Sequence, residues 1–163
     1  MTEGNPTDFA LALMGGAMVQ RQQADTLLAC NEKTAAYGLV LTAQQAMALA
    51  NTRAETLKKT GRIEFGSGVL DKLLLAFCDS PYLVQDNYED TLHALIDLFY
   101  SFKNETLDRV SDDALIEYMK KEFNGACRGS LELLAGKALP ALCRRLNRRR
   151  GDALFEKLEA TDD

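Results

Sequence analysis

Hydrophobic residues recur at helical spacing along nearly the whole chain. The segment from Asn87 to Asn104 shows it best, because at 100° per residue its apolar side chains fall on one face and its polar ones on the other. The apolar face consists of Tyr88, Leu92, Leu95, Ile96, Leu98, Phe99 and Phe102. We find no run of alternating apolar and polar residues long enough for a sheet. The pattern therefore predicts an all-α protein.

Capping residues and helix breakers divide this pattern into six or seven helices. Thr42 and Gln45 have the spacing of a capping box, and Gly61 is a typical left-handed stop. Ser111 is expected to cap a helix that stops at Gly125. A short helix is expected over 130–135, and another near residue 138, because proline is tolerated only in a first turn.

We expect these helices to form a single compact bundle, so that residues 1–163 make one helical domain. The glycine pair Gly15–Gly16 weakens the first helical segment, about 8–31, which predicts a break there or a mobile start over residues 1–16. Residues 152–163 are expected to form an acidic tail.

The composition indicates which class of protein this is and in which cellular compartment it is expected. Of its 163 residues, 47% are hydrophobic and 26% charged, as in ordinary globular proteins. No stretch approaches the roughly 18 uninterrupted apolar residues of a membrane span. The four cysteines lie far apart without a Cys-x-x-Cys pair, which is typical of reduced thiols. We therefore expect a cytoplasmic protein without a membrane span, and we predict no cofactor.

Three short motifs resemble a known family. They read Phe-Cys-Asp-Ser-Pro-Tyr at 77–82, Phe-Tyr-Ser-Phe-Lys-Asn-Glu at 99–105 and Met-Lys-Lys-Glu-Phe-Asn-Gly at 119–125. In these motifs the chain, from about Leu27 onward, resembles an uncharacterised bacterial family of small, all-helical cytoplasmic proteins, a domain of unknown function. The resemblance implies no activity, cofactor or catalytic residue.

A basic amphipathic helix is the strongest charge feature. Residues 144–150 hold five arginines and no acid, so they carry +5 while the rest carries −10, for a total of −5. The basic face consists of Lys137, Arg144, Arg145, Arg148 and Arg149. It could pair with the chain's own acids Asp152, Glu156 and Glu159, or bind an acidic protein, nucleic acid or an anionic lipid surface. The pI near 5.0 and the lack of interleaved aromatics weigh against nucleic acid.

A second candidate lies on the polar face of the segment 87–104. Glu89, His93 and Asp97 are spaced four apart, which aligns an imidazole between two carboxylates. Such a line could hold a divalent metal or an acid–base pair. The alternative is a solvated face opposite the apolar stripe, and no second carboxylate–histidine motif completes a two-metal site.

Two further candidates are a glycine-rich turn and a cysteine. Gly66-Ser67-Gly68 could receive an anion at a helix start, near Arg62 and Lys72, or form a simple loop and cap. Cys143 stands beside Arg144, a setting that favours a thiolate, yet it also belongs to the apolar stripe of Leu139, Leu142 and Leu146. On that stripe it would be a structural thiol.

These observations predict a non-catalytic protein–protein interaction or accessory subunit. Its contact surface would be the basic helix together with the apolar segment from Phe9 to Val19, which could also mediate self-association. One alternative is a nucleic-acid-associated regulator that uses the arginines. A third is a metal-binding or enzymatic site around His93.

Overall fold

The computed structural model describes residues 6–65 and 68–148, with side chains from residue 16 onward. Its internal contacts divide the chain into two compact units, 1–100 and 101–163, hereafter unit 1 and unit 2. The described residues contain helices and turns and no strand, which confirms the all-α prediction.

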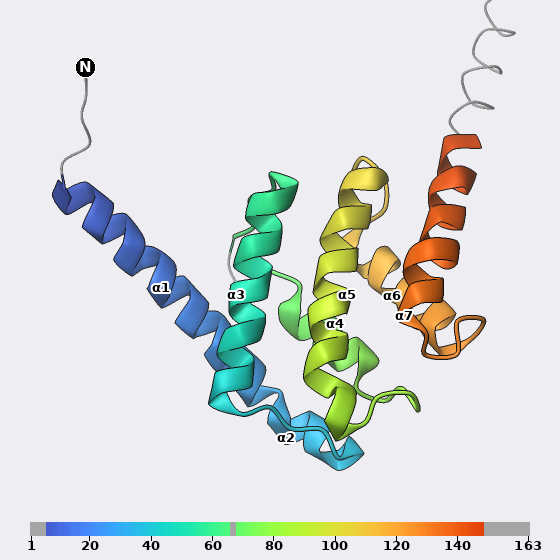
Figure 1. The fold of residues 1–163 in the computed structure, drawn as a ribbon, viewed down its shortest axis with the longest axis horizontal. Helices are drawn as coiled ribbons and strands as arrows, with labels where there is room; N and C mark the ends of the chain where they lie inside the picture. Colours follow the sequence, from blue (N-terminus) through green and yellow to red (C-terminus); the bar gives the residue numbers. More distant parts are fainter. Residues whose placement is uncertain (1–5, 66–67, 149–163) are drawn as a thin grey trace, which may run out of the picture. The chain divides into compact units, whose positions relative to one another are not determined.

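Unit 1 is built on three long helices (Figure 1). It contains α1 (Pro6–Ala29), α2 (Asn31–Thr34), the 3-10 turn η1 (Ala35–Tyr37), α3 (Ala43–Thr60), α4 (Leu70–Phe77) and residues 85–100 of α5 (Gln85–Glu105). α1 packs along α3 and touches α4. The largest side chains of its core are Leu27, Leu39, Leu49, Leu73, Leu74, Phe77, Tyr88, Leu95, Phe99 and Tyr100.

The ends of α3 confirm the predicted signals. The Thr42 hydroxyl accepts a hydrogen bond from the Gln45 amide at 3.1 Å, and the Gln45 side chain accepts one from the Thr42 amide at 2.9 Å. Together they form the capping box. Gly61 ends the helix in the left-handed conformation, with φ of 68°.

α1 differs from the prediction, because it runs without a break through Gly15–Gly16. Each glycine disfavours a helix by about 1 kcal/mol relative to alanine but does not forbid it, so packing of the rest of α1 can maintain the helix. Residues 1–5, part of the predicted mobile start, and the predicted acidic tail 152–163 lie outside the described residues. In the expected self-association segment, Phe9 to Val19, side chains are described only for residues 16–19, among which Met18 and Val19 are exposed.

Unit 2 begins with residues 101–105 of α5. It continues with α6 (Asp112–Asn124), α7 (Leu131–Leu133), the π turn η2 (Leu134–Ala138) and a helix over residues 139–148, which we call the C-terminal helix. Ser111 caps α6 as predicted, by accepting from the Ala114 amide at 3.2 Å. The unit 2 core consists of Leu115, Ile116, Met119, Phe123, Cys127, Leu134, Ala138 and Leu139.

Pro140 is accommodated differently from the prediction. We expected a short helix to end near residue 135 and a new one to begin near 138, but the backbone is helical from 131 to 148. The π turn η2 makes this possible: the Leu139 amide bonds to the Leu134 carbonyl, five residues back. This wider turn loosens the backbone just before Pro140, which lacks an amide hydrogen. Among the described helices, none is both long and apolar enough to cross a bilayer.

Candidate functional site: a groove along the C-terminal helix

Two adjoining cavities lie between α6 and the helical run from α7 to the C-terminal helix. The first measures about 310 Å³ and the second about 250 Å³, and both are bordered by Tyr118 and Glu122. The first adds residues of the turn after α6, of α7 and η2, and Ala141, and the second adds Lys121 and residues further along the C-terminal helix. We therefore treat them as one groove. Its other lining residues are Lys121, Ala126, Cys127, Leu133, Lys137, Ala138, Ala141, Leu142, Arg145 and Leu146.

The floor of the groove is largely apolar. Leu133 is 43% exposed, and Leu142 and Leu146 are half-buried. The sequence assigns these two leucines, with Leu139, to a buried stripe, yet only Leu139 is fully covered. The remainder of the predicted core face of the C-terminal helix thus faces a solvent-accessible groove.

Tyr118 fixes the distance between the two walls of the groove. Its hydroxyl donates a hydrogen bond to the Ala138 carbonyl at 2.7 Å. The Arg145 guanidinium carbon lies 5.5 Å from the centre of the Tyr118 ring, within the range of a cation–π contact. Burial raises the pKa of Tyr118, and the Glu122 carboxylate raises it further, so the hydroxyl keeps its proton. One side chain from α6 therefore holds the opposite helix at two points.

The charged residues of the groove are mostly basic. Lys121, Lys137 and Arg145 supply three positive charges and Glu122 one negative charge, for a net +2. Two of the predicted basic residues, Lys137 and Arg145, thus belong to the groove. Arg144 and Arg148 are exposed on the same helix and are not among the residues lining these cavities. Arg149 and the predicted acidic partners Asp152, Glu156 and Glu159 lie outside the described residues.

Arg109 secures the far end of the C-terminal helix. Its guanidinium donates hydrogen bonds to the Leu146 carbonyl at 3.1 Å and to the Asn147 side-chain oxygen at 2.9 Å. A third bond, from Nε to the Thr106 carbonyl at 2.9 Å, orients the arginine. Sequence reasoning missed Arg109, because no local pattern reveals a partner nearly forty residues away.

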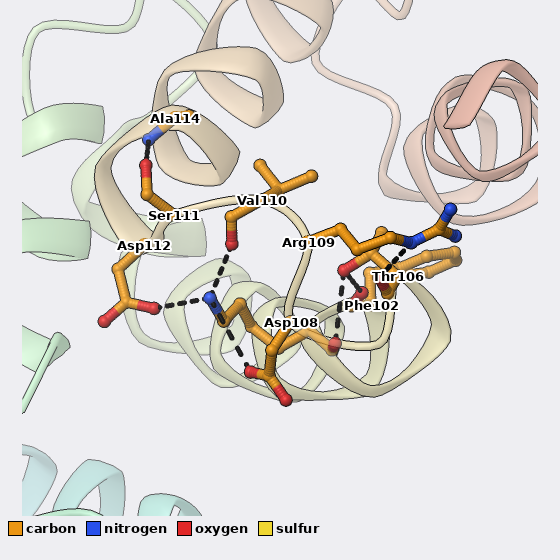
Figure 2. Close-up of polar contacts among 9 residues, drawn as sticks. Phe102, Thr106, Asp108, Arg109, Val110, Ser111, Asp112 and Ala114 are labelled. Carbon is orange, nitrogen blue, oxygen red and sulfur yellow. Dashed lines mark hydrogen bonds and ion pairs between the residues drawn. The ribbon is translucent and has the colours of Figure 1, made fainter. Parts of the chain in front are cut away.

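The turn that carries Arg109 is organised around Lys103, which is buried. Figure 2 shows Asp108, Val110 and Asp112, which contact its ammonium. The Lys103 ammonium donates to the Val110 carbonyl at 2.6 Å and pairs with Asp112 at 2.9 Å and Asp108 at 3.8 Å. Leu107 and Asp108 have φ of 54° and 57°, which is unusual for residues other than glycine. The Lys103 contacts stabilise this turn and thereby position Arg109.

The predicted metal or acid–base trio is not brought together. His93 Nε2 lies 3.0 Å from a Glu89 oxygen, and His93 Nδ1 lies 2.6 Å from the Thr52 hydroxyl. Asp97 instead pairs with Lys59 at 2.9 Å. Within the described residues, no group of three or more metal-ligating side chains occurs. The polar face of α5 is only partly solvated, since His93 contacts Thr52 and Asp97 contacts Lys59, both on α3.

Thr52, His93 and Glu89 form a hydroxyl–imidazole–carboxylate row, the order found in nucleophile–base–acid sites. Acyl transfer also needs free N–H donors for the oxyanion. Thr52 lies in the middle of α3, where backbone N–H groups bond within the helix. We therefore interpret the row as a polar link between α3 and α5.

The predicted anion site at 66–68 contains a carboxylate. Only Gly68 is described, and a Cβ added to it would lie 1.7 Å from a Glu64 oxygen. That oxygen also accepts from Arg53 at 2.8 Å and from the Tyr100 hydroxyl at 2.5 Å. Burial and then Glu64 raise the pKa of Tyr100. The Glu64 carboxylate thus already occupies the space beside Gly68 and pairs with Arg53, which disfavours an anion there.

The cysteines do not resemble nucleophiles. Cys30, Cys78, Cys127 and Cys143 are all free thiols, and the first three are buried. Burial and then the Glu105 carboxylate raise the pKa of Cys143, despite the opposing effect of Arg109 and Arg144. Its position on the apolar stripe of the C-terminal helix supports a structural thiol.

The fold and groove describe an all-helical protein with an open, basic-rimmed groove. A sequence model described as "Family of unknown function (DUF6323)" matches residues 26–152, most of the chain. The chain belongs to that family, which confirms the resemblance to an uncharacterised domain. All groove-lining residues, 118–146, fall inside the match. Neither the curated proteins nor the solved structures include a match.

Proposed function

We propose that this protein is a non-catalytic interaction subunit that binds a partner protein in the groove of unit 2. One observation carries the proposal: two adjoining cavities with an apolar floor lie open between helices that Tyr118 and Arg109 hold in place. A preformed apolar groove binds with little cost in ordering, which suits recognition of a protein segment.

The chemistry of the groove favours a protein over a nucleic acid. Nucleic-acid surfaces rely on many phosphate contacts, and single strands on exposed aromatic faces. Here the groove's aromatic ring, Tyr118, is covered by Arg145, and the whole chain has a net charge of −5. Apolar residues such as Leu133 and Leu142 would add little binding free energy with a phosphate backbone, but much with an apolar side chain of a partner protein.

The proposed setting is the cytoplasm of a bacterial cell. Four free thiols, three of them buried, support a reducing compartment. The bacterial source rests on the family resemblance alone.

The proposal is tested by site-specific photo-crosslinking in cells of the source organism. A photoreactive residue is placed at Leu133 in the groove or, as a matched control, at its exposed neighbour Glu132, which does not line the groove. We expect a discrete protein adduct from position 133 that is absent from position 132 and survives nuclease treatment. Mass spectrometry identifies the partner. Equal adducts at both positions, or an adduct that nuclease removes, would refute the proposal.

A further inference from the structure

Resting on that proposed function, we infer that the element bound in the groove is an amphipathic α-helix of the partner that presents carboxylates to Lys121, Lys137 and Arg145. The secondary structure and the charge of the partner element follow from how the lining residues of the groove are spaced.

The groove has the length and shape of a short helix. On the C-terminal side its lining residues recur at 137–138, 141–142 and 145–146, one pair per helical turn. At 1.5 Å per residue the positions from 137 to 146 span about 13.5 Å, or two and a half turns. The opposite wall is α6 and the turn that follows it, and it runs antiparallel: Ala126 and Cys127, after α6, line the first cavity with η2, whereas Lys121 lines the second with Arg145. Because Tyr118 bridges the two walls, a partner helix would lie along the open side of the groove and pack against both of them.

Small residues let that helix approach closely. Ala126, Ala138 and Ala141 line the first cavity, and the larger apolar side chains, such as Leu133 and Leu142, stand beside them. A helix placed here would insert one apolar side chain into each cavity, spaced by a turn or two. Such insertion buries apolar surface on both partners, the usual source of affinity in helix-in-groove recognition.

The charged residues of the groove indicate which charges a bound helix would carry along its polar edges. Lys137 lies at the first cavity, Lys121 and Arg145 at the second, and Glu122 at both. The positive charges therefore stand toward the two ends and the single negative charge in the middle. A complementary helix carries carboxylates near its ends, about two turns apart, and tolerates a cation between them.

The inference is tested with designed helical peptides of about 15 residues, long enough to cover the groove. The first carries a leucine stripe and flanking glutamates, the second has lysine in place of each glutamate, and the third has the first peptide's composition in a scrambled order. Binding of each fluorescent peptide to the full chain is measured by anisotropy. We expect the acidic amphipathic peptide to bind roughly tenfold more tightly than the other two.

Charge reversal on the protein provides the matched control. The variant Lys137→Glu/Arg145→Glu should weaken binding of the acidic peptide by at least about tenfold and strengthen binding of the lysine peptide. The variant Arg144→Glu/Arg148→Glu makes the same charge change on exposed positions outside the groove lining and should have a much smaller effect. Circular dichroism confirms that each variant remains helical.

The outcomes separate the two proposals. Equal affinity for the three peptides, or equal effects of the two double variants, would overturn the inference by showing attraction to net charge alone. If no peptide binds while position 133 still crosslinks specifically to a protein, the helix inference is wrong and the proposed function stands. If the crosslink is also absent, both fail.

Discussion

The two units place their buried cations in different settings. In unit 1, Arg53 is 4% exposed and meets the carboxylate of Glu64, which also accepts from Tyr100. In unit 2, Lys103 is 6% exposed, but it bonds to a backbone carbonyl and to Asp112, whose side chain is 46% exposed. The first cation is neutralised inside the fold. The second organises a turn at the surface.

The surfaces differ in the same way. In unit 1, pairs such as Thr52–His93 and Lys59–Asp97 join α3 to α5, and the nearby cavity of about 390 Å³ is lined mainly by polar residues, including Gln44 and Glu89. In unit 2 the polar contacts, such as that of Tyr118 with the Ala138 carbonyl, hold the walls of an apolar groove. The hollow of unit 1 is therefore lined mainly by polar side chains and the groove of unit 2 mainly by apolar ones, which favours unit 2 as the proposed binding site.

The largest loss in the free energy of unfolding is expected from Glu64→Ala in unit 1. Removing one partner of a buried ion pair leaves the other charge uncompensated, which costs about 3–5 kcal/mol. The Glu64 side chain is 17% exposed, so we expect the lower end, about 3 kcal/mol in urea unfolding. The control Arg53→Met/Glu64→Leu removes both charges and should recover most of that loss. A single variant as stable as the unchanged protein would show that water already screens the pair.

A smaller loss in the free energy of unfolding is expected from Lys103→Met in unit 2. The change leaves the Val110 carbonyl without its donor, which costs about 1–3 kcal/mol. Hydrogen exchange should also become faster in the turn over residues 106–111. Lys121→Met, on the exposed surface of α6, is the control and should change the free energy of unfolding little. Slow exchange retained in the turn would contradict the organising role of Lys103.

The smallest effect is expected from Asp97→Asn, which breaks a surface ion pair. The side chains of Lys59 and Asp97 are 67% and 45% exposed, so water and salt screen the attraction. We expect the free energy of unfolding to change by less than about 0.5 kcal/mol. If Asp97→Asn lowered the free energy of unfolding as much as Lys103→Met, solvent exposure would not explain the difference between the surface pair and the buried cations.

Local signals account for the parts of the fold that the sequence predicts well. The Thr42–Gln45 capping box, the Ser111 cap and the stop at Gly61 each depend on bonds within a few residues. The predicted break at Gly15–Gly16 was wrong because propensity is a weak local term that packing can override. Only part of the candidate site was predictable: Lys137 and Arg145 stood out by charge, whereas Arg109 and Tyr118 did not.

By itself, the sequence determined the helical class, the main helix ends, the shortage of metal-ligand motifs and the basic helix, because periodicity and capping act over one or two turns. Only the tertiary structure decided that Asp97 turns to Lys59, that Arg109 holds Leu146, and that the stripe containing Leu142 lines a groove. These outcomes depend on side chains far apart in the chain meeting in one place. Whether an apolar face is buried or left open depends on how closely the neighbouring helix packs against it.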